Sequence, residues 1–313
     1  MRKNLNVVKI CGKLYAFGDA NGRQALELKT TGAGSKAPGT QYIGGIMQVA
    51  IDDAGLNVIP VHFTYVTATT STGKTNNTFT VLKKLIEDGK TWLNVGPEAA
   101  AKVKIDAAIA INDFYNNEGN LISAKMIEGS FVSTNVDTCK PEDRNSFSVD
   151  MLITSVAHTD ADPEANIPAD FVTVHGAVFN FRGALLPVDF VVRNERGMAY
   201  FEDLNASTSN PIYTKVWGTV DCLTKKTEIR EESAFGSDAV RTYERKVRDW
   251  VITGTSTTPY DFDTEETITA AELSKALQDR EVYLADIKKR TDEYRNGGKS
   301  AAPATSSNKK FEF

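Results

Sequence analysis

The order of predicted strands and helices is the most restrictive feature of this chain, because one order occurs twice. In the first half, five segments are rich in β-branched and aromatic residues, and a helical pattern separates the third from the fourth. Gly89 can end that helix. The predicted strands are 7–17, 42–51, 58–66, 103–112 and 121–133, and the predicted helix is 79–88.

The second half repeats this order less strongly. Its predicted strands are 147–157, 171–181, 185–193, 213–223 and 247–255, with a short helix at 198–205. Three strands contain a glycine after an alternating apolar start, at Gly12, Gly176 and Gly218, where a barrel strand that bends sharply needs room. Strand, strand, strand, helix, strand, strand is the order of the OB-fold, a five-stranded Greek-key barrel. The sequence therefore predicts a mainly β protein with two OB-like barrels, and an unrelated pair of β-sandwiches is the alternative.

Composition changes along the chain predict four parts. A polar stretch at 138–146 separates a first OB-like domain, 1–137, from a second, 146–262, although the loop 160–170 is an alternative boundary. Residues 266–296 form a predicted C-terminal helix that packs on its own domain, because Leu273, Leu277 and Leu284 share one face and Thr269 begins a capping box. The low-complexity tail, 297–313, is predicted to be disordered.

Several classes of protein have little support in the composition. No apolar run approaches the roughly 20 residues needed to cross a bilayer, and the N-terminus has no apolar region of a signal peptide. Cys11, Cys139 and Cys222 are an odd number at wide spacing, which favours a reducing compartment and neither a disulfide framework nor a zinc site. We therefore expect a cytoplasmic protein, in the host cell if it is viral, without a metal or an organic cofactor.

One motif is typical of an enzyme, but other features of the sequence argue against that function. Residues 68–75 (ATTSTGKT) fit a loose phosphate-binding loop with Lys74, but the first glycine of the pattern is missing. The closely spaced strands also predict antiparallel hairpins, whereas a nucleotide-binding domain of this type needs parallel strands with helical crossovers. His62 and His175 lie in predicted strands and are expected to be structural. We predict that the chain is not an enzyme.

Aromatic and basic residues alternate in the places where an OB barrel binds its ligand. Single-stranded nucleic acid needs cations for its phosphates and aromatic rings on which bases stack. Residues 1–135 contain 14 Lys and Arg against 11 Asp and Glu, a net charge of +3, and form the only basic part of a chain with a net charge of -5. The candidate binding residues are Lys13, Tyr15, Arg23, Lys29, Lys36, Tyr42, Phe63, Tyr65, Phe114, Tyr115, Arg182, Arg193, Lys225 and Lys226. About half of the aromatic residues are expected to be core.

The first half resembles phage-encoded single-stranded DNA-binding proteins of the OB-fold type. The resemblance rests on the segment order around FTVLKKLIED and on KVKIDAAIAINDFYNNEGNLISAKMIEG, which is similar to the hairpin of the last two barrel strands. It implies a protein that coats and protects single-stranded DNA during replication or recombination. In that family an acidic tail ending in Phe recruits partner proteins, which implies partner contacts at Phe311 and Phe313. Here Lys309 and Lys310 stand where the acidic run would be.

The expected partner is therefore single-stranded DNA, and the tail is expected to bind replication or recombination proteins. We expect no membrane association, and a homo-oligomer is compatible with the sequence. A β-rich virion or assembly protein is the first alternative. A nucleotide hydrolase acting through Lys74 is the second.

Overall fold

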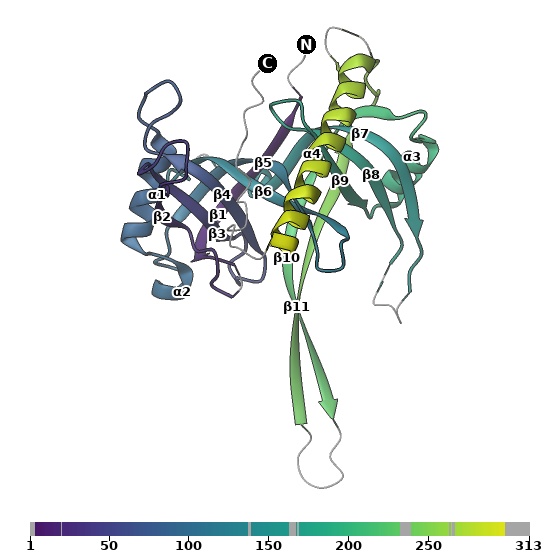
Figure 1. Ribbon diagram of the computed structural model, residues 1–313. Coiled ribbons are helices and arrows are strands. Elements are labelled where there is room, and N and C mark those ends of the chain that lie inside the picture. Colours follow the sequence, from purple (N-terminus) through teal and green to yellow (C-terminus); the bar gives the residue numbers. More distant parts are fainter. Residues whose placement is uncertain are drawn as a thin grey trace.

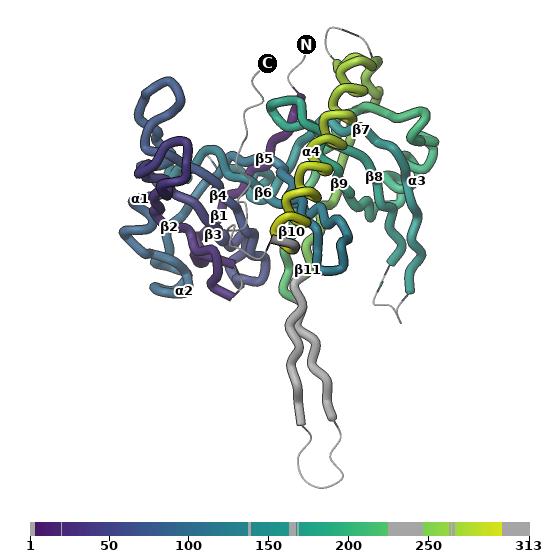
Figure 2. Tube along the Cα trace, in the orientation of Figure 1, coloured from purple at the N-terminus to yellow at the C-terminus, as the bar shows by residue number. Residues whose placement is uncertain are grey.

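Strands make up most of the regular structure of this computed structural model, which confirms the prediction of a mainly β chain (Figures 1 and 2). The structure describes residues 4–19, 21–136, 139–162, 167, 169–231, 239–262, 264 and 267–297, and only the backbone of 225–231, 239–246, 296 and 297. The strands are β1 (Asn6–Phe17), β2 (Glu27–Thr30), β3 (Gln41–Ala50), β4 (Val58–Thr67), β5 (Lys102–Tyr115), β6 (Leu121–Ser133), β7 (Asn145–Thr159), β8 (Phe171–Phe179), β9 (Leu185–Val192), β10 (Ile212–Glu231) and β11 (Ala239–Thr255). The helices are α1 (Asn77–Asp88), α2 (Trp92–Val95), α3 (Glu195–Asp203), α4 (Ala270–Gly297) and the 3-10 turn η1 (Pro141–Asp143).

All eleven strands belong to one sheet, in the order β10-β11-β9-β8-β7-β1-β5-β6-β4-β3-β2. Two further pairings, β1 with β3 and β10 with β7, connect five strands of each half into a ring. Within each ring the third strand runs parallel to the fifth, and the other pairs are antiparallel. Because β1 also pairs with β7, the sheet continues from one half into the other, and two separate barrels are not what the structure shows.

The core follows from the alternation of apolar residues along the strands. In β1, Val8, Ile10 and Leu14 are fully buried, and one apolar cluster runs from Leu82 on α1 through β1 to Trp250 on β11. The helix α1 begins where the Asn76 side chain accepts a hydrogen bond from the backbone N–H of Thr78, and it ends at Gly89 in the left-handed conformation. This matches the predicted helix and its predicted end.

The three glycines predicted to make room inside bending strands do so. A Cβ atom on Gly12 would lie 2.1 Å from the carbonyl oxygen of Ala50 on β3. The corresponding distances are 2.0 Å from Leu152 O for Gly176 and 1.8 Å from Val251 O for Gly218. Each glycine therefore allows the backbone of a neighbouring strand to approach where a side chain would prevent it.

A polar contact joins the two halves beside the sheet. The Asn57 side chain, 8% exposed, donates to the carboxylate of Asp221 and accepts from the backbone N–H of Cys222, both at 2.9 Å. Asn145 donates to the same Asp221 oxygen at 2.9 Å. The start of β4 is thereby held against β10.

The C-terminal helix α4 contacts both halves, as its course across the front of Figure 1 illustrates. The predicted capping box is present, because the Thr269 hydroxyl accepts from the N–H of Glu272 while the Glu272 carboxylate accepts from the N–H of Thr269. Ile268 and Ala276 pack in a second apolar cluster with Phe179 and other second-half residues. The helix therefore packs on the second half, as predicted, and also contacts β5 of the first half.

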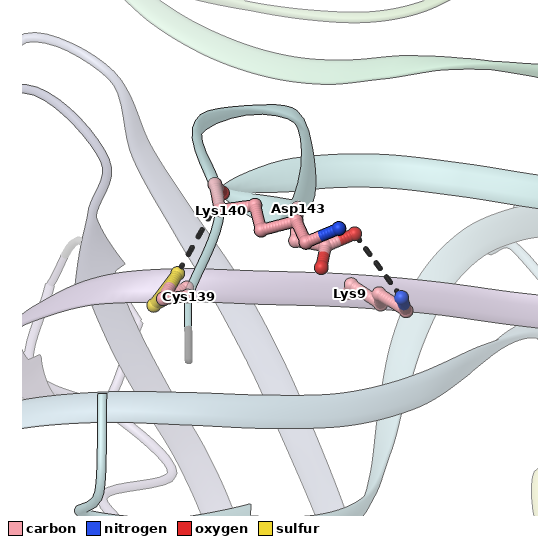
Figure 3. The surroundings of a disulfide bond; sticks show 5 residues. Lys9, Cys139, Lys140 and Asp143 are labelled. Atoms are coloured by element: carbon pink, nitrogen blue, oxygen red, sulfur yellow. Dashed lines mark hydrogen bonds and ion pairs between the residues drawn. A yellow bond between two sulfur atoms is a disulfide. The ribbon is translucent and has the colours of Figure 1, made fainter. Parts of the chain in front are cut away.

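The cysteines correct a prediction. Cys11 on β1 and Cys139 form a disulfide across 128 residues of sequence, while Cys222 is buried and free. Spacing alone did not indicate this pair, because the return of the chain beside β1 is a tertiary event. Next to the disulfide, the Lys9 ammonium lies 3.1 Å from the Asp143 carboxylate (Figure 3).

Other differences concern the length and number of elements. The strands β10 and β11 are far longer than predicted and pair with each other as far as Glu231 and Ala239, so much of the predicted connection between them is strand. The short elements β2, α2 and η1 lack a sequence pattern long enough to predict. The predicted tail beyond residue 297 lies outside the described residues, and the proposed division at 138–146 stays a prediction.

Candidate nucleic-acid interface

Three predicted residues meet on neighbouring strands and form what we call the tyrosine face: Lys29, Tyr42 and Tyr65. Lys29 on β2 is directly opposite Tyr42 on β3. The rings of Tyr42 and Tyr65 on β4 are 4.7 Å apart and tilted by 38°. Tyr65 is 48% exposed, so part of this aromatic pair is accessible from solvent.

A register shift helps to place the two tyrosines together. The pairing of β3 with β4 shifts between Ile43 and Gly45, so Gly44 on β3 lies opposite two residues of β4, Thr64 and Tyr65. A Cβ atom on Gly44 would lie 3.2 Å from the Tyr42 ring and 3.0 Å from Thr64 O. The small residue at the bulge thus leaves room for the Tyr42 ring beside β4.

Two predicted cations lie on loops near these strands. Lys36 is exposed in the loop that joins β2 to β3, which is closed by hydrogen bonds between Thr31 and Thr40. Arg23 is exposed in a turn where the Asp19 carboxylate accepts from its backbone N–H at 2.8 Å. Lys29 itself lies 3.5 Å from Glu27, so one carboxylate partly offsets the positive charge of the tyrosine face.

Phe63 on β4 was predicted to bind nucleic acid, but the structure buries it. It is 1% exposed and packs in the core, with its ring beneath Gly129 of β6. No base can stack on a ring that solvent does not reach, so its assignment to the binding surface is wrong. The alternation of side chains along a strand predicts that Phe63 and Tyr65 share one face. It does not show that Phe63 is buried while Tyr65 is half exposed.

Lys13 and Tyr15 form a different cluster, held within the protein. Tyr15 lies 5.8 Å from the Trp92 ring on α2, and the Lys13 ammonium is 5.5 Å from that ring. Lys13 also donates to Asp53 at 3.0 Å, and this hydrogen bond lowers the pKa of the Asp53 carboxyl. These groups are engaged with one another, away from the tyrosine face, and Trp92 was missed because nothing in the sequence connects it to β1.

Phe114 and Tyr115 lie at the end of the β5–β6 hairpin, which α4 fastens. Arg280 of α4 makes two hydrogen bonds to the Asp113 carboxylate, at 2.8 and 3.1 Å, and the Asp113 side chain is 2% exposed. Arg295 donates to the carbonyl oxygen of Tyr115 at 3.4 Å. Phe114 remains 43% exposed. The structure does not bring this pair together with Tyr42 and Tyr65.

The second-half candidates are dispersed. Arg193 is paired with Asp249 at 2.8 Å and lies 5.8 Å from the Phe171 ring. Arg182 lies over the ring of Phe181 in the β8–β9 turn, at 5.0 Å. Lys225 and Lys226 are on the paired part of β10, but their side chains are not described, and Phe311 and Phe313 lie outside the described residues.

A group of basic side chains lies where the halves meet, and sequence reasoning missed Lys125 within it. The Lys125 ammonium on β6 lies 5.4 Å from the Phe190 ring centroid and donates to Asp189 O, and Arg248 donates to Lys125 O at 3.3 Å. Burial lowers the pKa of Lys125 to about 8. Burial, assisted by the charge of Arg248, lowers the pKa of His62 to about 4. His62 is therefore neutral at pH 7, and no sequence signal links these strands.

The phosphate-loop pattern at 68–75 folds as a closed turn. The backbone N–H of Thr70 donates to Lys74 O at 2.8 Å, and Gly73 donates to Thr70 O at 2.9 Å. These groups are satisfied within the turn, and the sheet around them lacks the parallel arrangement of a nucleotide-binding domain. His175 is bonded to Asp189 at 2.7 Å, in keeping with the structural role predicted for it.

The described part of the chain contains no cluster of three or more His, Cys, Asp or Glu side chains arranged to hold a metal ion. Among its helices, none combines the length and apolar character needed to cross a membrane.

Comparison with known proteins gives one family. No curated protein matches the chain. Among solved structures, a deletion mutant of the single-stranded DNA binding protein from Thermus aquaticus is similar with a TM-score of 0.45 and 13% identity, over 85% of this chain and 100% of that one. A likeness of this size does not indicate a shared function. Residues 18–290 match the family described as YorF, which is most of the sequence. The chain belongs to the YorF family.

Proposed function

We propose that this protein binds single-stranded DNA without chemical conversion and that the tyrosine face is the centre of the binding surface. The observation that carries the proposal is the contact of Tyr42 with the half-exposed Tyr65, directly beside Lys29. A base can stack on the open side of the aromatic pair while the lysine neutralises a neighbouring phosphate. Both requirements of single-strand binding are therefore met within three adjacent strands.

The position of these residues in the fold supports the same function. In chain order, β3 and β4 are the second and third strands of the first five-stranded ring, which has the helix α1 before its fourth strand. In an OB barrel the ligand-binding surface is centred on the second and third strands. The proposal therefore includes an OB-like arrangement of each ring, although the two share one sheet.

Charge is consistent with a local rather than a general attraction for DNA. The first 135 residues carry a net charge of +3, and Lys36 and Arg23 extend from loops beside β2 and β3. Binding that depends on a few phosphate contacts weakens as salt concentration rises, with a slope set by their number. Coating and protecting the strand during replication or recombination is the role that we propose for such binding, in a phage or its host.

The test is fluorescence anisotropy of a labelled single strand of about 30 nucleotides, compared with its duplex over a salt series. We expect tight, salt-sensitive binding of the single strand and little binding of the duplex. The double variant Tyr42→Ala, Tyr65→Ala removes the aromatic pair. It should weaken binding by about 5- to 150-fold for each base that can no longer stack there.

The matched control is Tyr294→Ala, which removes a 58% exposed tyrosine from α4 and should leave affinity unchanged. Absence of single-strand binding at low salt would refute the proposal. If the protein instead forms large assemblies without nucleic acid, seen by light scattering, an assembly role replaces it.

A further inference from the structure

The β8–β9 turn presents the most exposed large apolar side chain of the described residues. Phe181 is 87% exposed. The preceding aromatic, Phe179, is 2% exposed and packs edge-on against Tyr213 at 6.5 Å. Burial stabilises a folded protein in proportion to the apolar surface removed from water, so Phe181 contributes almost nothing to the stability of this chain. Its ring is available for a ligand.

The turn that carries Phe181 is fixed by its own hydrogen bonds. The Asn180 side-chain oxygen accepts from the backbone N–H groups of Arg182 and Ala184, both at 2.9 Å. The backbone of Asn180 pairs with Ala184 at 3.0 Å, and Gly183 has a φ of 79°, which glycine adopts without strain. The ring therefore projects from a closed turn whose backbone geometry is set in advance.

Neighbouring elements hold both sides of the turn. The Asn6 side chain on β1 donates to Phe179 O at 3.4 Å, and Arg280 on α4 donates to Leu185 O at 3.5 Å. The same Arg280 binds Asp113 of the first half. A ligand that contacts Phe181 is thus held by a part of the second half that is anchored to the first half.

The chemistry beside the ring suits a nucleobase and its phosphate. The Arg182 guanidinium lies 5.0 Å from the centre of the Phe181 ring, within the range of a cation–π contact. Aromatic rings and guanidinium planes are the groups on which unpaired bases stack, and the guanidinium also attracts phosphate. A solvent-facing aromatic ring on a closed turn, with a guanidinium beside it, provides both contacts.

We infer that the Phe181–Arg182 turn is a second contact point for the same single strand that binds the tyrosine face. This inference rests on the proposed function and extends it, because it makes binding bivalent. A strand long enough to reach both places gains affinity from the second contact, whereas a short strand does not. One five-stranded barrel of the OB type covers about 4 to 16 nucleotides, so strands of about 8 and about 30 nucleotides separate the two cases.

The experiment compares the full-length chain with Phe181→Ala on both strand lengths, by anisotropy at fixed salt. We expect the variant to bind the long strand about 5- to 150-fold more weakly and the short strand normally. Phe181→Trp should retain binding, and Phe181→Leu, which is apolar without an aromatic ring, should behave like Phe181→Ala. Phe131→Ala removes a 63% exposed phenylalanine from β6 and is the matched control, expected to change neither affinity.

A second readout locates the contact directly. Single strands with 5-iodouracil at successive positions should crosslink to the peptide containing Phe181 only when the strand is long. Normal binding by Phe181→Ala at both lengths, while Tyr65→Ala binds weakly, would overturn this inference and leave the proposed function standing. Equal weakening at both lengths would also overturn it. Failure of the unmodified protein to bind any single strand would reject both proposals. Phe181 would then be assigned to contact with a protein partner instead.

Discussion

At the scale of single residues, local chemistry decides which side chains are available and which are sterically constrained. Tyr65 and Phe63 are two positions apart on β4, yet one is half exposed and the other buried. Glycine at positions 12, 176 and 218 is required because neighbouring carbonyl groups occupy the space of a side chain.

Replacement of Gly12 by alanine tests this crowding. The new Cβ would lie 2.1 Å from Ala50 O, so β1 and β3 must separate locally. We expect Gly12→Ala to lower the free energy of unfolding by about 1–3 kcal/mol, measured by urea denaturation. Gly34→Ala is the control, because nothing lies within 4 Å of its added Cβ and its loss should stay within about 0.5 kcal/mol. Equal losses in the two variants would contradict the explanation.

His62 predicts a dependence of stability on pH. Its pKa is about 4 in the folded protein and 6.5 as an ordinary side chain, because burial and Arg248 oppose its charge. Between these values the unfolded chain binds a proton that the folded one does not, so stability falls as the pH decreases from about 6.5 to about 4. The loss should approach about 3–4 kcal/mol at most, since a unit of pKa corresponds to about 1.4 kcal/mol.

The measurement is the free energy of unfolding against pH for the unmodified chain and for His62→Gln. The glutamine does not titrate, so the difference between the two curves isolates His62 from other groups, including His158, whose pKa is raised by its hydrogen bond to Glu202. If the two curves are parallel between about pH 4 and 6.5, His62 is not the group that causes the pH dependence.

At the scale of elements, α4 and the β5–β6 hairpin act as a unit. Phe114 and Tyr115 of this hairpin are candidate binding residues, and Arg280 and Arg295 hold the hairpin against the helix. The predicted capping box correctly placed the start of α4, since that signal is local. What the helix packs against depends on residues far away in the chain, such as Asp113, which is 167 positions from Arg280, and has no local signal.

Arg280→Ala should detach the helix from the hairpin. The substitution leaves the Asp113 carboxylate buried without its cation, which costs about 3–5 kcal/mol. Amide hydrogen exchange should speed up in α4 and at the end of β5. Arg290→Ala is the matched control, because Arg290 forms an exposed pair with Asp286 one turn away that contributes about 0.5 kcal/mol or less. If both variants are equally stable, the buried pair is not what holds the helix.

At the scale of the whole molecule, the two halves are one connected structure. The pairing of β1 with β7, the Asn57–Asp221 contact and α4 all cross between them. The disulfide ties β1 to the segment that enters the second half.

Cys139→Ser should therefore destabilise the oxidised protein. A link that closes a loop of this length restricts the unfolded chain and contributes about 5 kcal/mol. We expect the thermal midpoint of the unmodified protein to fall to that of the variant when reductant is added, while the variant itself does not respond. Cys222→Ser, which alters a cysteine outside the disulfide, should keep the response to reductant. A midpoint of the unmodified protein that ignores reductant would show that the link does not form.

Local patterns predicted the longer elements of this protein and their order, two helix caps and the glycines inside strands, because these depend on periodicity and on neighbours close in the chain. They did not predict β2, α2, η1 or the full length of β10 and β11. The sequence also placed Lys29, Tyr42 and Tyr65 among the binding candidates. Tertiary contacts were needed to show that Phe63 is core, that Cys11 meets Cys139, that α4 holds the hairpin and that both halves share one sheet. These contacts join residues that are far apart along the chain. Their burial and pairing depend on how the strands curve and close, and a local pattern of residues contains no information about that.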